Sequence, residues 1–204
     1  MILRVEQISR LPQRKHVIKK LDGTLLYSGE VEKVFKARIE LEYKKVDIVT
    51  DDINRTIISE NNVQIGEISS KVFVTKKILF LPIGYEYNEV LYGGRTYHMY
   101  ESGLGANQHF FSIYFEGKTI AVIHKDDRVV NYLNTYTLYA ETEEEMEVAL
   151  ICTMFLESTA FCDRTAGIGY KVEDSPYYTT QKELRDKYDP NFIPMIKEMH
   201  EINQ

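Results

Sequence analysis

The segment that most constrains the fold is an apolar run late in the chain, Val148–Leu156, which reads VALICTMFL. It holds one polar residue, Thr153, so it predicts a helix that is covered on all sides rather than along a single stripe. The run is about half of the roughly 20 residues that a bilayer span needs. Glu147 and Glu157 bracket it closely, so we expect protein rather than lipid to cover the helix.

The full helix is predicted to extend from Thr142 to Arg164. Thr142 and Glu145 have the spacing of a capping box. The acidic residues Glu143–Glu145 also place negative charge at the positive end of the helix dipole. Ala160–Cys162 extend the apolar content, and Asp163–Arg164 end the predicted helix.

Both cysteines, Cys152 and Cys162, fall in this helix. Their separation is roughly 15 Å along a helix axis, which is too far for a disulfide. We therefore expect buried, reduced thiols. The N-terminal residues lack an apolar core of signal-peptide length. Together these observations predict a cytoplasmic protein.

The residues before the helix show short strand patterns with a turn signal about every ten residues, which is typical of a β-sandwich or β-barrel. Turns are predicted at Asp22–Gly23, Asn61–Asn62, Gly93–Gly94 and Glu116–Gly117. Residues 103–107 are expected to form a loop. Pro82 and Gly84 are expected to end the strand at residues 71–81. The predicted strands are residues 2–8, 15–20, 24–30, 36–43, 44–50, 55–59, 63–68, 71–81 (one longer strand or a bent pair), 89–92, 95–101, 109–115, 119–125 and 129–140 (one strand or two).

The order of these elements predicts the architecture. About 140 residues of strand precede one helix that is apolar on all sides. Wrapping the sheet around the helix covers the helix and removes the edges of the sheet. We therefore expect a mainly β protein: a closed antiparallel barrel of about twelve strands around a central hydrophobic helix, followed by a C-terminal helical extension.

The tract Gly117–Asp163 resembles the closing part of the tubby C-terminal-like superfamily, which includes LURP-one-related proteins and phospholipid scramblases. The similar features are an Ile-Ala-x-Ile strand at Ile120–Ile123, a Tyr-rich strand at Tyr132–Tyr139, and the apolar helix ending near Asp163. The early segment KHVIKKLDGTLLYSGE resembles the repeated strand units of that barrel. The resemblance implies a barrel of twelve strands around a central helix. The basic residues with which tubby binds phosphoinositides have no position-by-position match.

The chain continues for 40 residues beyond the segment that resembles the family. We expect a barrel domain at residues 1–164, with its central helix at 142–164, and a helical extension at 165–204 packed on the barrel. Thr180 and Glu183 have capping-box spacing for a short helix to about Tyr188. Asp189–Pro190 is predicted to open a last helix, whose apolar stripe is Phe192, Ile193, Ile196 and Met199.

Charge is distributed unevenly along the chain. The net charge is −6, which argues against a nucleic-acid partner. Residues 1–80 hold 15 Lys and Arg against 11 Asp and Glu, whereas residues 81–204 hold 10 against 20. The lysine pairs Lys44–Lys45 and Lys76–Lys77 are therefore the candidate contacts for anionic lipid. Each pair can place at most one side chain outward on a regular strand.

No residue pattern predicts catalysis, a metal site or a cofactor. The GLGA segment at Gly103–Ala106 lacks the third glycine and the following helix of a dinucleotide loop. His98, His109 and His124 could converge only if their strands were neighbours. We expect a non-enzymatic binding or scaffold module that contacts anionic lipid headgroups or a protein partner. The alternative is a small-ligand carrier or an enzyme, which would need a pocket of several hundred Å³ with convergent polar groups.

Overall fold

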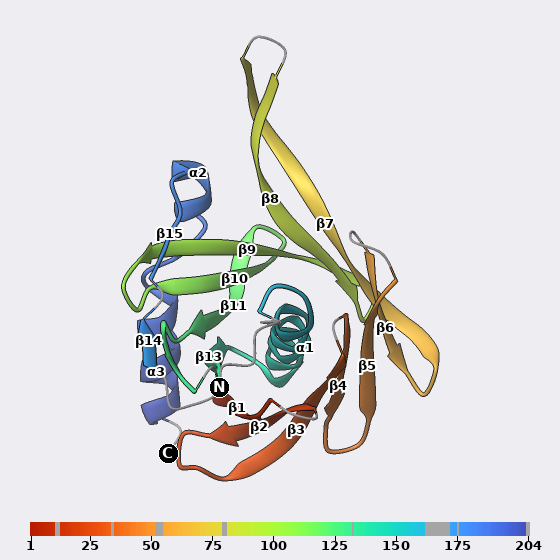
Figure 1. Cartoon of the computed structure of the whole chain (residues 1–204). Coiled ribbons are helices and arrows are strands. Elements are labelled where there is room, and N and C mark those ends of the chain that lie inside the picture. The colour runs from red at the N-terminus through yellow and green to blue at the C-terminus, as the bar shows by residue number, and fades with distance from the viewer. Residues whose placement is uncertain are drawn as a thin grey trace.

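The computed structural model describes residues 1–10, 13–33, 35–51, 55–78, 81–131, 133–161, 172–174 and 176–202. Twelve antiparallel strands form a closed barrel, as predicted (Figure 1). Each strand pairs with the next one along the chain, and β13 returns to pair with β1. The strands of the ring are β1 (Ile2–Ser9), β2 (Arg14–Lys20), β3 (Leu25–Lys33), β4 (Lys36–Glu40), β5 (Lys45–Thr50), β6 (Arg55–Glu60), β7 (Val63–Ile78), β8 (Leu81–Tyr92), β9 (Arg95–Gly105), β10 (His109–Phe115), β11 (Lys118–Lys125) and β13 (Thr135–Ala140).

Three further strands lie beside the ring. β12 (Arg128–Val130) pairs with β14 (Val172–Asp174) in a separate two-stranded sheet. β15 (Tyr177–Tyr178) adds to the outer end of β9. The sequence did not predict β14 or β15, because two or three residues are too few to show an alternating pattern.

The tight turns that the sequence predicts are confirmed. Gly93–Gly94, Asn61–Asn62 and Glu116–Gly117 all have positive φ at both positions. Such turns match the right-handed twist of the strands that they join. Gly23 also has positive φ, at 89°. These turns set the pairing register of four hairpins around the ring.

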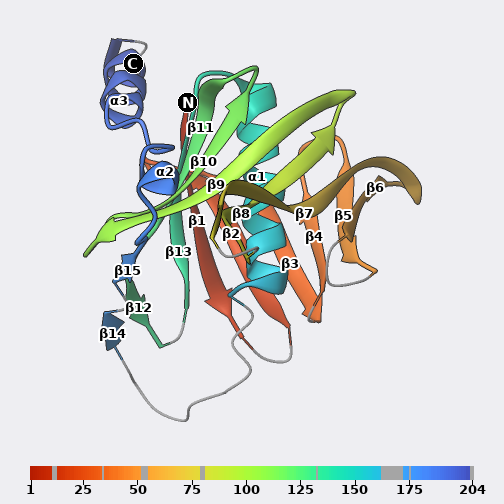
Figure 2. The ribbon, with the colours of Figure 1, turned by 90° about the horizontal axis from the view of Figure 1, so that it is seen from above.

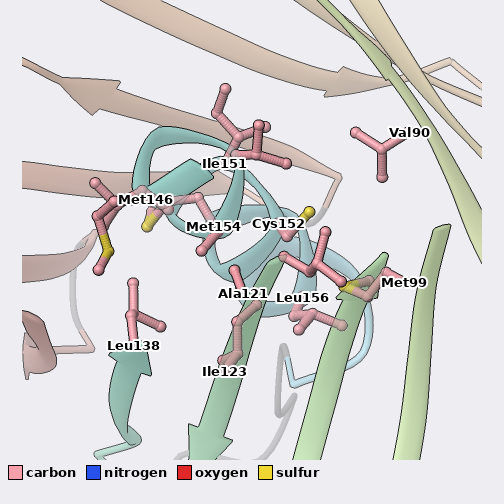
Figure 3. Packing of buried hydrophobic residues seen from close by; sticks show 14 of the residues in the cluster. Val90, Met99, Ala121, Ile123, Leu138, Met146, Ile151, Cys152, Met154 and Leu156 are labelled. Atoms are coloured by element: carbon pink, nitrogen blue, oxygen red, sulfur yellow. The ribbon is translucent and has the colours of Figure 1, made fainter. Parts of the chain in front are cut away.

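The central helix α1 (Glu143–Thr159) runs through the barrel (Figures 1 and 2). Thr142 caps it, and the predicted capping box with Glu145 forms in both directions. Its residues are buried on every side from Val148 to Met154. Figure 3 shows how α1 meets the inward residues of the strands. The labelled contacts are Met146, Ile151, Cys152, Met154 and Leu156 on α1, and Val90, Met99, Ala121, Ile123 and Leu138 on the strands.

The predicted end of the helix at Arg164 is wrong, because α1 ends at Thr159. The backbone N–H groups of Ala160 and Phe161 both donate to the carbonyl of Leu156, which closes the last turn. Phe161 then packs against the aromatic rings of Phe111 and Tyr136. An α-helix of this length is about 25 Å long at ~1.5 Å per residue. Cys162 lies outside the described residues.

Two predictions about the strands are also wrong. Pro82 and Gly84 do not end a strand: they lie inside β8, where Pro82 is in register with Lys77 and Gly84 with Val74. Residues 81–87 of β8 pair on one side alone among the described residues, so a proline without N–H can face the open edge. Gly84 suits the strand because a Cβ there would collide with the Phe73 backbone.

The predicted loop at residues 103–107 begins later, since β9 continues to Gly105. Gly103 pairs with His109 of β10, and Gly105 pairs with Tyr177 of β15. A Cβ at Gly103 would collide with the Tyr177 backbone, so the glycine permits this close approach. From the sequence alone the glycines of this segment indicate a loop. The strand β15 that pairs with it lies about 70 residues away, in the C-terminal extension.

The extension folds back onto the outside of the barrel (Figure 1). α3 (Phe192–Ile202) buries Phe192 and Ile196 against Ile2, Phe110 and Tyr139. α2 (Lys182–Arg185) is shorter than predicted, and the predicted capping box of Thr180 and Glu183 is wrong, because the N-cap residue is Gln181 and its side chain makes no capping hydrogen bond. Gln181 instead donates to the Gly84 carbonyl at 2.8 Å, which ties the extension to β8.

Candidate functional site

A cavity of about 380 Å³ lies inside the barrel at the end where α1 begins. One wall is a single face of the helix, formed by residues spaced three and four apart. The other walls come from β1, β3 and the turn between β4 and β5. We call this cavity the mouth pocket. It is lined by Met1, Leu3, Leu26, Tyr27, Leu41, Glu42, Tyr43, Lys44, Glu143, Met146, Glu147 and Leu150.

The mouth pocket shows that the helix leaves part of the barrel interior unfilled. A second cavity of about 270 Å³ lies at the opposite end, beside Phe155, Leu156 and Thr159. The helix therefore fills the middle of the barrel but not its ends. The larger cavity reaches the size range of ligand pockets, roughly 300–1,000 Å³. A sequence signal existed in the row Glu143, Met146, Glu147 and Leu150, which mixes apolar and acidic residues on one helix face.

Lys44 lies at the rim of the mouth pocket, with Glu147 as its partner. The Lys44 Nζ is 2.6 Å from the Glu147 carboxylate and 3.2 Å from the Tyr92 hydroxyl. The Tyr92 hydroxyl donates to the same carboxylate. Burial, followed by this hydrogen bond, raises the pKa of Tyr92. The three groups therefore form a closed set, in which the lysine charge is already neutralised.

The other lysines selected from the sequence have different surroundings. Lys45 points away from Lys44, is 64% exposed at its side chain and pairs with Glu40 at 2.6 Å. Lys44 lies in the turn before β5, so the different surroundings of the pair follow from its ion pair with Glu147 and not from the alternation of a strand. Lys76 and Lys77 lie in β7, in register with Ile83 and Pro82, but their side chains lie outside the described part of the structure. Lipid contact by these four residues stays a prediction.

The second candidate surface is the outer half of the β7–β8 hairpin, which projects from the barrel (Figure 1). We call residues 70–78 of β7 and 81–87 of β8 the arm. In the described residues they pair with each other and with no other strand. Val72, Phe73 and Val74 of the arm are 64%, 52% and 44% exposed. The arm therefore has two open edges and apolar side chains in water.

A buried polar cluster that the sequence did not reveal lies at the other end of α1. The carboxylate of Glu157 is wholly buried and pairs with His16 Nε2 at 3.0 Å. It also accepts hydrogen bonds from Asn134, at 2.8 Å, and from the hydroxyl of Tyr136. We call these four residues the Glu157 cluster. It ties the end of the helix to β2 and to the start of β13.

Electrostatics in the Glu157 cluster favour a charged carboxylate. Burial alone would raise the pKa of Glu157, but the His16 contact and the hydrogen bonds from Tyr136 and Asn134 outweigh it and lower the pKa. Burial raises the pKa of Tyr136 well above its ordinary value. His16 and Glu157 are sealed from solvent. The cluster holds acid–base groups that a substrate cannot reach, so its geometry fits a structural role.

Three further histidines and Cys152 lie apart from any metal-ligand arrangement in the described residues. His98, His109 and His124 lie on the neighbouring strands β9, β10 and β11, yet each has its own partner. Their partners are Glu89, Glu101 and the Asn107 carbonyl, in that order. Across the described residues, no three His, Cys, Asp or Glu groups are placed to hold a metal ion. Burial raises the pKa of Cys152 to about 12, which makes its thiol unreactive at neutral pH.

Comparisons with known proteins add no identity to this geometry. The chain matches no protein-family model, no curated protein and no solved structure. None of the helices in the described ranges has the length and apolar character that a bilayer crossing requires.

Proposed function

We propose that the chain is a non-enzymatic binding module of the tubby-like type, located in the cytoplasm, that contacts anionic membrane surfaces through the arm. The closed twelve-stranded barrel around an apolar helix supports the tubby-like assignment, because this is the architecture that the sequence resemblance implies. A buried, unpaired Cys152 is consistent with a reducing compartment.

The observation that carries the proposal is the exposure of Val72, Phe73 and Val74 on a two-stranded arm. A hairpin of two strands is marginally stable in water on its own, and exposed apolar patches mark contact surfaces. The arm extends beyond the barrel, and these three side chains stay largely exposed although Phe73 stacks on Tyr85. A surface that accepts apolar groups would cover them.

Charge favours a membrane as that surface. The sequence from Lys71 to Tyr85 holds three lysines and no acidic residue, although the whole chain has a net charge of −6. Lys71 is half-exposed and lies 3.5 Å from Glu89. Apolar residues flanked by lysines suit the boundary between acyl chains and anionic headgroups. A protein partner that adds a strand to the open edge is the competing occupant.

Vesicle flotation tests the proposal. The chain is expected to float with phosphatidylcholine vesicles that contain phosphatidylserine or a phosphoinositide, and not with phosphatidylcholine alone. Each lysine near an anionic surface contributes about 1 kcal/mol, and strand alternation places one of these two side chains outward, so the double variant K76Q/K77Q should bind about fivefold more weakly. F73S should also weaken binding, because it removes the largest exposed apolar group described on the arm.

The matched control is K45Q, which removes one exposed lysine from the barrel wall outside the arm. It should float like the unchanged chain. Equal recovery with neutral and anionic vesicles would exclude the lipid proposal. Loss of flotation in K45Q but not in K76Q/K77Q would move the lipid contact from the arm to the barrel wall. A protein captured by the unchanged chain and lost from F73S would assign the arm to a protein partner.

A further inference from the structure

The mouth pocket has an apolar interior. Leu3, Met146 and Leu150 line it and are each no more than 2% exposed. Leu26 and Leu41, which pack against the same core, complete the lining. At about 380 Å³ the cavity has room for a small molecule with a short hydrocarbon body. Such a body would gain the free energy of leaving water without disturbing the core.

The rim of the same pocket is acidic. Glu42, Glu143 and Glu147 line it, and Lys44 is the basic side chain among the lining residues. Lys44 is already held by Glu147 at 2.6 Å. The amino group of Met1, which also lines the pocket, donates to the Ala140 carbonyl at 2.7 Å. The carbonyl is neutral, so the Met1 ammonium keeps its charge, and the three carboxylates of the rim exceed its two positive groups by one.

Two carboxylates at the rim keep acceptor capacity for a ligand. The contact described for the Glu42 carboxylate is a neutral one, from the Tyr43 hydroxyl at 2.7 Å. Glu143 has no ion pair among the described residues, and its side chain is exposed at the mouth. The rim therefore offers unneutralised negative charge directly above an apolar floor.

Two tyrosines also favour a positively charged ligand at this rim. Tyr43 is 90% exposed on the turn between β4 and β5, and Tyr27 points into the pocket from β3. Aromatic faces attract ammonium groups. Burial, and then the charges of Glu42, Glu143 and Glu147, raise the pKa of the Tyr27 hydroxyl. The negative field thus converges on one place in the cavity.

We propose that the mouth pocket binds a small ammonium compound with a short apolar chain. The chain would lie among Leu3, Leu26 and Leu150, and the ammonium group would lie between Glu42 and Glu143 near the Tyr27 ring. This site shares no residue with the arm, so it does not depend on membrane binding.

Thermal unfolding with three matched probes tests the charge preference. Octylammonium, octanol and octanoate have the same chain but carry a positive, a neutral and a negative head. Octylammonium below its micelle concentration is expected to raise the Tm in a saturable way, with octanol weaker and octanoate without effect. An equal response to all three probes, or no response to octylammonium, would overturn the proposal.

Variants locate the binding site within the chain. E143Q should weaken octylammonium binding about fivefold, as expected for an exposed ion pair. The matched control is E144Q, which removes the same charge from the same helix turn, where Glu144 pairs with Arg95 away from the pocket. Equal losses in E143Q and E144Q would indicate attraction to the acidic protein as a whole and would overturn the site.

A third variant tests the cavity itself. L26W fills the pocket from β3, where Leu26 is only half-buried and a larger side chain can be accommodated. It should abolish the octylammonium response while the protein still unfolds cooperatively. An unchanged response in L26W would overturn the proposal. Octylphosphocholine, compared with octylammonium, would separate a lipid-derived headgroup from a free amine: the one that binds more tightly identifies the source.

Discussion

The two ends of α1 carry glutamates that occupy opposite environments. Glu157 is sealed in the barrel and accepts hydrogen bonds from side chains of two strands. Glu147 is 23% exposed at its side chain, at the rim of a cavity, and shares its carboxylate with Lys44 and Tyr92. In the sequence both residues bracket the same apolar run. The difference shows that one end of the helix is anchored inside the barrel and that the other end borders a cavity.

Removal of the Glu157 carboxylate is expected to lower the stability of the fold more than removal of the Glu147 carboxylate. Glu157→Ala leaves His16, Asn134 and Tyr136 without their buried acceptor, so it should destabilise the fold by about 3–5 kcal/mol. Urea unfolding followed by circular dichroism measures this change. Should Glu157→Ala unfold at the same urea concentration as the unchanged chain, the anchor role of the cluster would be refuted.

A pH series sharpens the same contrast. The folded pKa of Glu157 lies below its ordinary value of 4.5, so its contribution to stability is complete above that pH. The contribution is lost as the pH falls through the lowered pKa, when protonation becomes possible in the folded state. Because glutamine does not titrate, we expect the free energy of unfolding of Glu157→Gln to fall less between these pH values than that of the unchanged chain. Urea unfolding between about pH 6 and pH 3 compares the two chains. Parallel stability curves would assign the acid sensitivity to other carboxylates.

A substitution at the exposed end of α1 should change the free energy of unfolding less. Glu147→Gln removes a partly exposed ion pair, and such pairs contribute about 1 kcal/mol or less. The Tyr92 hydroxyl keeps a neutral acceptor in this variant, which limits the loss further. Urea unfolding measures the change beside Glu157→Ala. A cost as large as that of Glu157→Ala would mean that both ends of the helix are anchors.

The smallest effect is expected on the outer wall. Lys45→Gln breaks an exposed contact with Glu40 and should change the free energy of unfolding by about 0.5 kcal/mol or less. The same urea experiment measures it, and the variant serves as the baseline for the other three. A larger cost would show that barrel-wall ion pairs matter to the stability of this fold.

Much of the fold followed from the sequence because its signals are local. The capping box at Thr142, the paired glycines at 93–94 and the period of two at residues 36–40 each depend on neighbouring residues, although the predicted strand at 36–43 ends three residues early. The apolar run at 148–156 added the one non-local conclusion, that strands must surround it. The resemblance to a known barrel agreed with this conclusion.

The sites were less accessible to prediction because they depend on distant pairs. Glu157 reads as an ordinary polar end of a helix until β2 brings His16 to it across 141 positions. The pairing of Gly103 with the extension was hidden for the same reason. The mouth pocket depends on how far α1 fills the barrel, which residue spacing does not determine. Lys44 was selected for its charge, but its partner lies on the helix.

The order of the strands has a consequence for synthesis of the chain. Closure joins Ile2 to Tyr139, and the helix that fills the interior follows closure in the sequence. At 5–20 residues per second, a ribosome needs roughly 7–28 s to produce the first 140 residues. Throughout that time α1 has not been synthesised, so nothing covers the apolar inner face of the strands. A nascent chain of this topology is therefore expected to fold late and to engage chaperones until α1 emerges.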